Sequence, residues 1–63
     1  MSDSTWPRGV SAPAARALAA AGYHSVEQLA GVSASELLAL HGMGPKAIGV
    51  LREALRDRGL DFS

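Results

Sequence analysis

Two glycines one residue apart, followed by a proline and a lysine, form the most informative string in this chain of 63 residues. Gly42 and Gly44 permit a tight turn, and Pro45 suits the first position of a new helix. Free backbone N–H groups at a helix start, the positive end of the helix dipole and Lys46 together form a site for an anion. Such a site would hold a phosphate without recognising a base, because amides and a positive charge contact the phosphate alone.

The elements that position this string are predicted to be helices throughout. A favourable N-cap precedes each of the first three predicted helices, and two caps match the capping-box pattern S/T-x-x-E/Q. The caps are Ser11, Ser25 with Gln28, and Ser33 with Glu36, and Pro45 opens the last helix. The expected helices cover residues 12–21, 26–30, 34–40 and 45–58. No stretch alternates apolar and polar residues as a strand does, so the sequence predicts an all-α fold, a compact bundle of four to five short helices.

Apolar residues at helical spacing predict the faces that lie inside. On the first and last helices these residues are Ala14, Ala17, Leu18, Ala21, Ile48, Leu51 and Leu55. Gly22 and Gly59, each followed by an apolar residue, predict that these two helices end in Schellman-type stops.

An internal repeat organises the chain. Residues Gly9–Ala14 align with Gly42–Ala47, both segments open a longer helix, and Leu18 then aligns with Leu51. Each unit is too small to bury its own apolar face, so we expect the two to pack about a pseudo-twofold axis. This arrangement places both helix N-termini on one side of the molecule.

The segment Leu40–Ile48 resembles the hairpin of the helix-hairpin-helix family, with Gly-apolar-Gly, then Pro-Lys, then small and apolar residues. The resemblance implies a tandem, SAM-like arrangement. It also implies that Met43 plugs the hairpin into the core, while amides of the turn and of the following helix hold a DNA phosphate.

From Gly9 to Phe62 the order of elements resembles the C-terminal domain of the bacterial RNA polymerase alpha subunit. The chain departs from that domain where the latter touches DNA. The domain's key arginine and nearby asparagine correspond to Pro13 and Arg16, and the serine after the lysine corresponds to Ala47. The resemblance therefore implies backbone contact through amides and positive charge, and not the minor-groove recognition of that domain.

The net charge is zero, with six basic and six acidic residues, which counts against tight DNA binding. Placement of the charges matters more than their sum, because binding depends on the local field. The basic residues expected around the two helix starts face no acidic residue except Asp3 in the tail. The predicted DNA contacts are Gly42, Gly44, Lys46, Ala47, Ser11, Arg16 and Arg8.

Several classes of function are excluded. The chain has no cysteine and two histidines, so we expect no metal site and no cofactor. It has no nucleophile, base and acid at plausible spacing and no Gly-Lys-Ser/Thr loop, so we expect neither an enzyme nor a small-molecule substrate. The longest apolar run, Ala17–Ala21, is too short for a membrane span, and a cytoplasmic protein of a bacterium is expected.

Residues 1–8 are expected to form a flexible tail that docks near its end through Trp6, and residues 9–63 the helix-hairpin-helix domain. One alternative stays open. The same helical bundle would also suit a protein-interaction module that docks on transcription or DNA-repair machinery, and a net charge of zero favours that alternative. Salt dependence separates the two, because DNA binding weakens steeply with salt and apolar docking does not.

Overall fold

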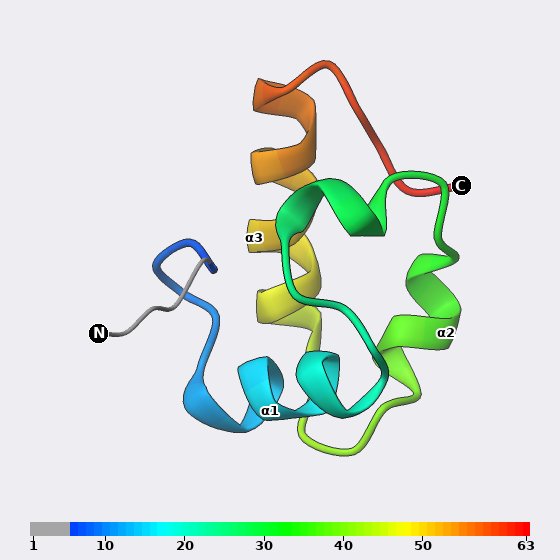
Figure 1. The fold of residues 1–63 in the computed structure, drawn as a ribbon. Coiled ribbons are helices and arrows are strands. Elements are labelled where there is room, and N and C mark those ends of the chain that lie inside the picture. The colour runs from blue at the N-terminus through cyan, green and yellow to red at the C-terminus, as the bar shows by residue number, and fades with distance from the viewer. Residues whose placement is uncertain (1–5) are drawn as a thin grey trace.

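The computed structural model describes residues 6–63, in which three α-helices and one 3₁₀ helix pack around a single core, with no strand in this range. The elements are α1 (Ala12–Ala20), η1 (Val26–Leu29), α2 (Ala34–Leu38) and α3 (Pro45–Asp57). In Figure 1, α3 stands upright and α1 lies across its lower end. Helix α3 packs against η1 and α2, which lie on the side of the molecule that carries the C-terminus.

The prediction of four to five helices is wrong, because the second predicted helix is a single 3₁₀ turn. Its capping box forms as expected, with the Gln28 side chain accepting the N–H of Ser25 at 3.2 Å. The N–H of Ala30 then bonds three residues back, to Glu27 at 3.2 Å, and the Ala30 backbone is extended. Gly31, with φ of +79°, turns the chain away before an α-helical turn can form. Helix α2 likewise ends earlier than predicted.

Both long helices end in the predicted Schellman motif. In each, the glycine after the helix donates to the carbonyl three residues earlier, and the next residue donates to the carbonyl five residues earlier. The bonds are Gly22 to Ala19 (3.0 Å), Tyr23 to Leu18 (2.9 Å), Gly59 to Arg56 (2.9 Å) and Leu60 to Leu55 (2.8 Å). The two halves of the repeat therefore stop their helices by the same hydrogen bonds.

The core consists of aliphatic side chains contributed by every element, together with Phe62 near the C-terminus. Its fully buried members are Leu18, Leu29, Leu37, Leu51, Leu55 and Val26. Ile48 is buried as predicted, and Met43 and Trp6 pack against the core while staying partly exposed. Ala21 was expected in the buried stripe and is instead exposed, because it is the C-cap residue of α1.

Of the predicted tail, residues 1–5 lie outside the described residues, and Trp6 is the part that contacts the core. Between residues 6 and 63, no helix combines the length and the apolar character that a membrane crossing requires.

Candidate functional site

Two turns with the same geometry precede the two long helices. In the first, the N–H of Val10 donates to the carbonyl of Pro7 at 3.3 Å; in the second, the N–H of Met43 donates to that of Leu40 at 3.1 Å. The third residue of each turn is a glycine in the left-handed region, with φ of +99° at residue 9 and +93° at residue 42. Each helix then begins three residues after its glycine. The sequence repeat thus corresponds to two hairpins of equal shape.

The two helix starts differ in their caps. The hydroxyl of Ser11 accepts the N–H of Ala14 at 3.3 Å, so the first turn of α1 has a side-chain cap. Gly44 occupies the equivalent position before α3 and has no side chain to offer. Within residues 6–63, the N–H groups of Lys46 and Ala47 consequently have no acceptor. The start of α3 presents two free donors at the positive end of a helix of 13 residues.

The two hairpin glycines have different roles. A side chain at Gly42 would bring a Cβ within 2.9 Å of the carbonyl oxygen of Pro13, and its φ is positive, so both packing and backbone require glycine there. Gly44 has an extended backbone with φ of −134°, and no atom lies within 4 Å of a Cβ placed on it. The turn itself therefore requires only the first of the two glycines. The second leaves the start of α3 uncapped and open.

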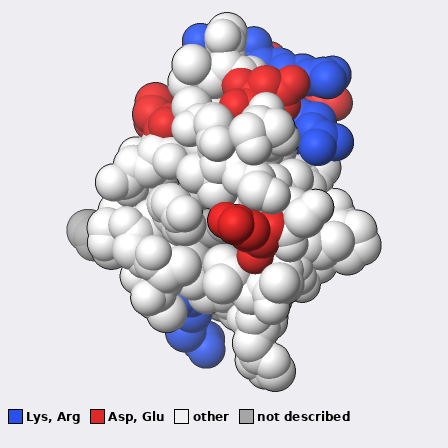
Figure 2. Space-filling view, turned by 90° about the vertical axis from the view of Figure 1, so that its right-hand side faces the viewer, with Lys and Arg blue, Asp and Glu red and all other residues white. Residues whose placement is uncertain are grey.

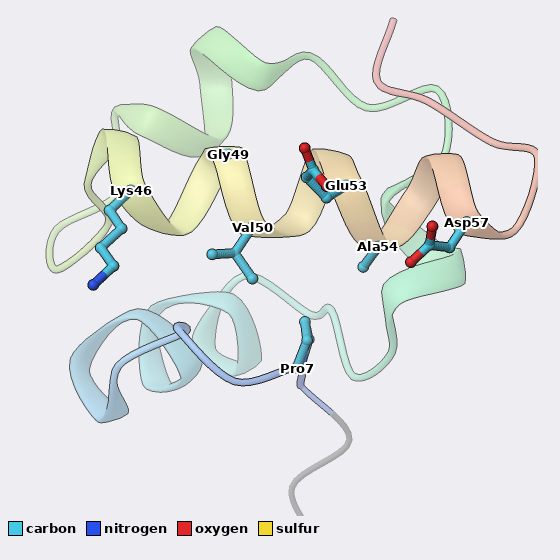
Figure 3. A pocket seen from close by; sticks show the side chains of 7 residues that line it. All are labelled: Pro7, Lys46, Gly49, Val50, Glu53, Ala54 and Asp57. Carbon is cyan, nitrogen blue, oxygen red and sulfur yellow. The ribbon is translucent and has the colours of Figure 1, made fainter.

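The close approach of Gly42 to Pro13 places the second hairpin against the first turn of α1. Both helix starts accordingly lie at the lower end of the molecule in Figure 1, as the repeat predicts. Lys46 extends from the first turn of α3 toward the side that carries α1 (Figure 3). The side chain of Ala47 is buried, so only its amide is available to a ligand, and the hydroxyl of Ser11 is engaged in its cap.

Salt bridges separate the basic residues into two groups. The arginines of the C-terminal half of α3 and of its C-cap have acidic partners. The ion pairs are Arg58–Glu27 (3.0 Å), Arg56–Asp61 (3.5 Å) and Arg52–Asp61 (3.8 Å). Hydrogen bonds from its own backbone amide and from the arginine lower the pKa of the Glu27 carboxyl below its usual value.

The remaining basic residues, Arg8, Arg16 and Lys46, are exposed, and no acidic residue within 6–63 pairs with them. Figure 2 shows the contrast on one face: blue and red atoms lie together at the upper end, and blue atoms without red ones at the lower end. The end with the free amides is therefore also the end whose positive charge is not neutralised. A phosphate placed there meets donors and cations together.

Sequence patterns indicated the hairpin but not the asymmetry between the two helix starts. The difference was present in the N-cap residues, serine against glycine, and comparing them would have distinguished the capped start from the open one. A groove along α3 that contains Gly49 was not predicted either. The only local signal for it was a glycine inside a helix, where alanine is favoured.

The chain matches the family described as a SAM-like helix-hairpin-helix tandem over residues 8–57, a range that contains both hairpins. Domains of this type generally bind nucleic acid and are generally not catalytic. No curated protein and no solved structure matches the chain. The narrower resemblance to the C-terminal domain of the RNA polymerase alpha subunit is not confirmed by these comparisons.

Proposed function

This chain belongs to the SAM-like helix-hairpin-helix tandem family, and we propose that it binds the phosphate backbone of DNA without catalysing a reaction. The observation that carries the proposal is the uncapped start of α3, where the free amides of Lys46 and Ala47 lie beside an ammonium group without an ion-pair partner in the described chain.

Each residue of the site has a defined task in this proposal. The amides of Lys46 and Ala47 donate to phosphate oxygens, and the ammonium of Lys46 neutralises part of the phosphate charge. Arg8 and Arg16 add positive charge that has no ion-pair partner within residues 6–63. Gly42 holds the hairpin against α1, and Ser11 keeps the first helix capped. None of these contacts distinguishes one base from another, so binding is tolerant of sequence.

Such a site predicts modest affinity. Backbone contacts alone typically give a dissociation constant on the order of 10⁻⁴ to 10⁻⁶ M at physiological salt. Two or three neutralised phosphates correspond to a log–log salt slope of about −2 to −3, at about −0.9 for each phosphate. The proposed setting is the cytoplasm of a bacterial cell, where DNA is accessible.

A second candidate is a module that docks on a protein of the transcription or DNA-repair machinery. The net charge of zero favours it, because most autonomous DNA-binding domains carry a basic excess. Binding to such a partner through apolar surface would be insensitive to salt, in contrast to phosphate binding.

A titration of a fluorescent duplex at several salt concentrations tests the proposal, with two variants that each remove one positive charge from α3. Lys46→Ala should weaken binding on every duplex and bring the salt slope closer to zero by about 1. Arg56→Ala is the matched control, because this arginine is also exposed but pairs with Asp61 at the other end of the helix. Equal losses for both variants would mean that only overall charge matters, and a salt-independent affinity would favour protein docking.

A further inference from the structure

An open groove of about 590 Å³ lies between α3 and the N-terminal segment (Figure 3). One face of the helix forms its long side, and Pro7, the first residue of the first hairpin turn, lies on the opposite side. The residues that matter for the argument are Pro7, Lys46, Gly49, Val50, Glu53 and Asp57. Lys46 lies at one end of the groove, and Glu53 and Asp57 lie toward the other end. The residues between them, Gly49 and Val50, are small or apolar.

Gly49 is the first unusual feature of this face. It lies inside α3, where glycine disfavours the helix relative to alanine. Its φ is not positive, and no atom lies within 4 Å of a Cβ placed on it, so nothing in the described fold requires glycine at this position. The consequence of the glycine is an exposed helix surface without a side chain, onto which a second helix can approach closely.

The order of charges is the second feature. Lys46 and Glu53 are both exposed, and neither has an ion-pair partner within residues 6–63. They lie at equal distances along the helix from the midpoint between Gly49 and Val50. An antiparallel copy of the same helix, crossing at that midpoint, therefore places each Lys46 against the partner's Glu53. The same crossing brings the bare helix surfaces of the two Gly49 residues close together, while Val50 stays beside Gly9 of its own chain.

From these two features we propose that α3 forms an antiparallel contact with α3 of a second copy of this chain. A twofold contact of this kind is self-complementary, since every interaction occurs twice. Asp57 lies one turn beyond Glu53 and extends toward the start of the partner's α3, whose positive end favours a carboxylate. In this contact Lys46 and Glu53 each face the opposite charge of the partner, and Asp57 faces the positive end of the partner's helix.

The dimer is weak. A single helix face and the rim of its groove bury less than the roughly 1,200 Å² that marks the lower limit of a standard interface. We therefore expect a dissociation constant on the order of 10⁻⁴ M, which makes the dimer detectable in concentrated solution.

Sedimentation equilibrium of the full chain without DNA, up to about 1 mM, tests the proposal through charge reversal. Lys46→Glu and Glu53→Lys each turn two attractive contacts of the dimer into two repulsive ones, and each should weaken dimerisation by about tenfold or more. An equimolar mixture of the two variants should associate, because both cross-contacts become attractive again, and the double variant should dimerise like the parent. Arg56→Glu reverses a charge of α3 outside the groove and serves as the control.

Gly49→Ala provides a test in which a loss of dimer cannot be explained by a loss of folding stability. The added methyl group should raise the melting temperature, because it favours the helix and meets no atom of its own chain. It should also weaken the dimer by about fivefold or more, because it occupies the point of closest approach. A parent chain that stays monomeric at about 1 mM, or a mixture of the two charge variants that associates no better than either alone, overturns the proposal.

Discussion

Replacing Gly44 by aspartate should make the domain more stable and at the same time weaken its binding to DNA. Gly44 already has the extended backbone of an N-cap residue, and a Cβ at this position meets no atom within 4 Å. An aspartate there can accept the N–H of Ala47, just as Ser11 accepts the N–H of Ala14 in α1. The same carboxylate would occupy and repel the site that a phosphate needs.

The size of both effects follows from these contacts. A capping side chain is worth a few tenths of a kcal/mol over glycine, and loss of glycine from the unfolded chain adds about 0.4–1 kcal/mol. A negative charge at a helix start contributes about 0.3–1 kcal/mol more. The gain of roughly 1–2 kcal/mol should raise the melting temperature by about 5–10 °C in a domain of this size. The loss of one phosphate contact should bring the salt slope closer to zero by about 0.9 and weaken binding by about tenfold.

Thermal melting by circular dichroism and duplex titration by fluorescence anisotropy measure the two effects on the same samples. Gly44→Ala is the matched control, because it removes the glycine without adding a cap or a charge, and its affinity for DNA is the reference for the effect of the carboxylate. Gly44→Asn adds the cap without the charge and should lie between the two. If Gly44→Asp is more stable and binds DNA as the parent does, the start of α3 is not the phosphate site. If it is less stable, the inferred N-cap geometry is wrong.

Three further variants test the fold that holds this site. Leu51→Ala should lower the free energy of unfolding by about 2–5 kcal/mol in urea denaturation, because this side chain is fully buried, and an unchanged midpoint would contradict its place in the core. Gly42→Ala should cost about 1–3 kcal/mol by the same measurement, because of its positive φ and the carbonyl of Pro13 at 2.9 Å from the new Cβ; parental stability would show that the hairpin tolerates a side chain there. The pKa of the Glu27 carboxyl is lower in the folded chain than its value of about 4.5 in the unfolded chain, so the ionised carboxylate stabilises the fold at a pH above about 4.5. This contribution is lost as the pH falls through the folded pKa. Glu27→Gln should therefore lose less stability than the parent between neutral and acidic pH in thermal melts, and identical acid profiles would contradict the ion pair.

The sequence predicted the ends of α1 and α3 and most of the core because these depend on local signals. Ser11 caps α1 as expected, the stops after residues 21 and 58 form as expected, and Leu51 faces inward because it continues the apolar spacing of α3. The length of the second helix could not be predicted in the same way. Its capping box is real, but Gly31 ends the segment after a single 3₁₀ turn, and a capping box marks only where a helix begins.

The site depended more on tertiary structure. From the sequence, Gly42 and Gly44 belong to one turn. Only the packing of Gly42 against Pro13 shows that Gly42 is required by the fold and that Gly44 is not. The groove along α3 arises because Pro7 lies across from residues that are far from it in the chain. No local pattern encodes that placement, so the groove and its charge order became visible only in the structure.

Amide chemical-shift mapping of the ¹⁵N-labelled chain, titrated with a short duplex at low salt, tests the central claim most directly. We predict that the largest shifts occur at the amides of Lys46 and Ala47, and that added salt reverses them. Unchanged resonances at these two amides, together with shifts near the paired arginines at the other end of α3, would contradict phosphate binding by the uncapped helix start.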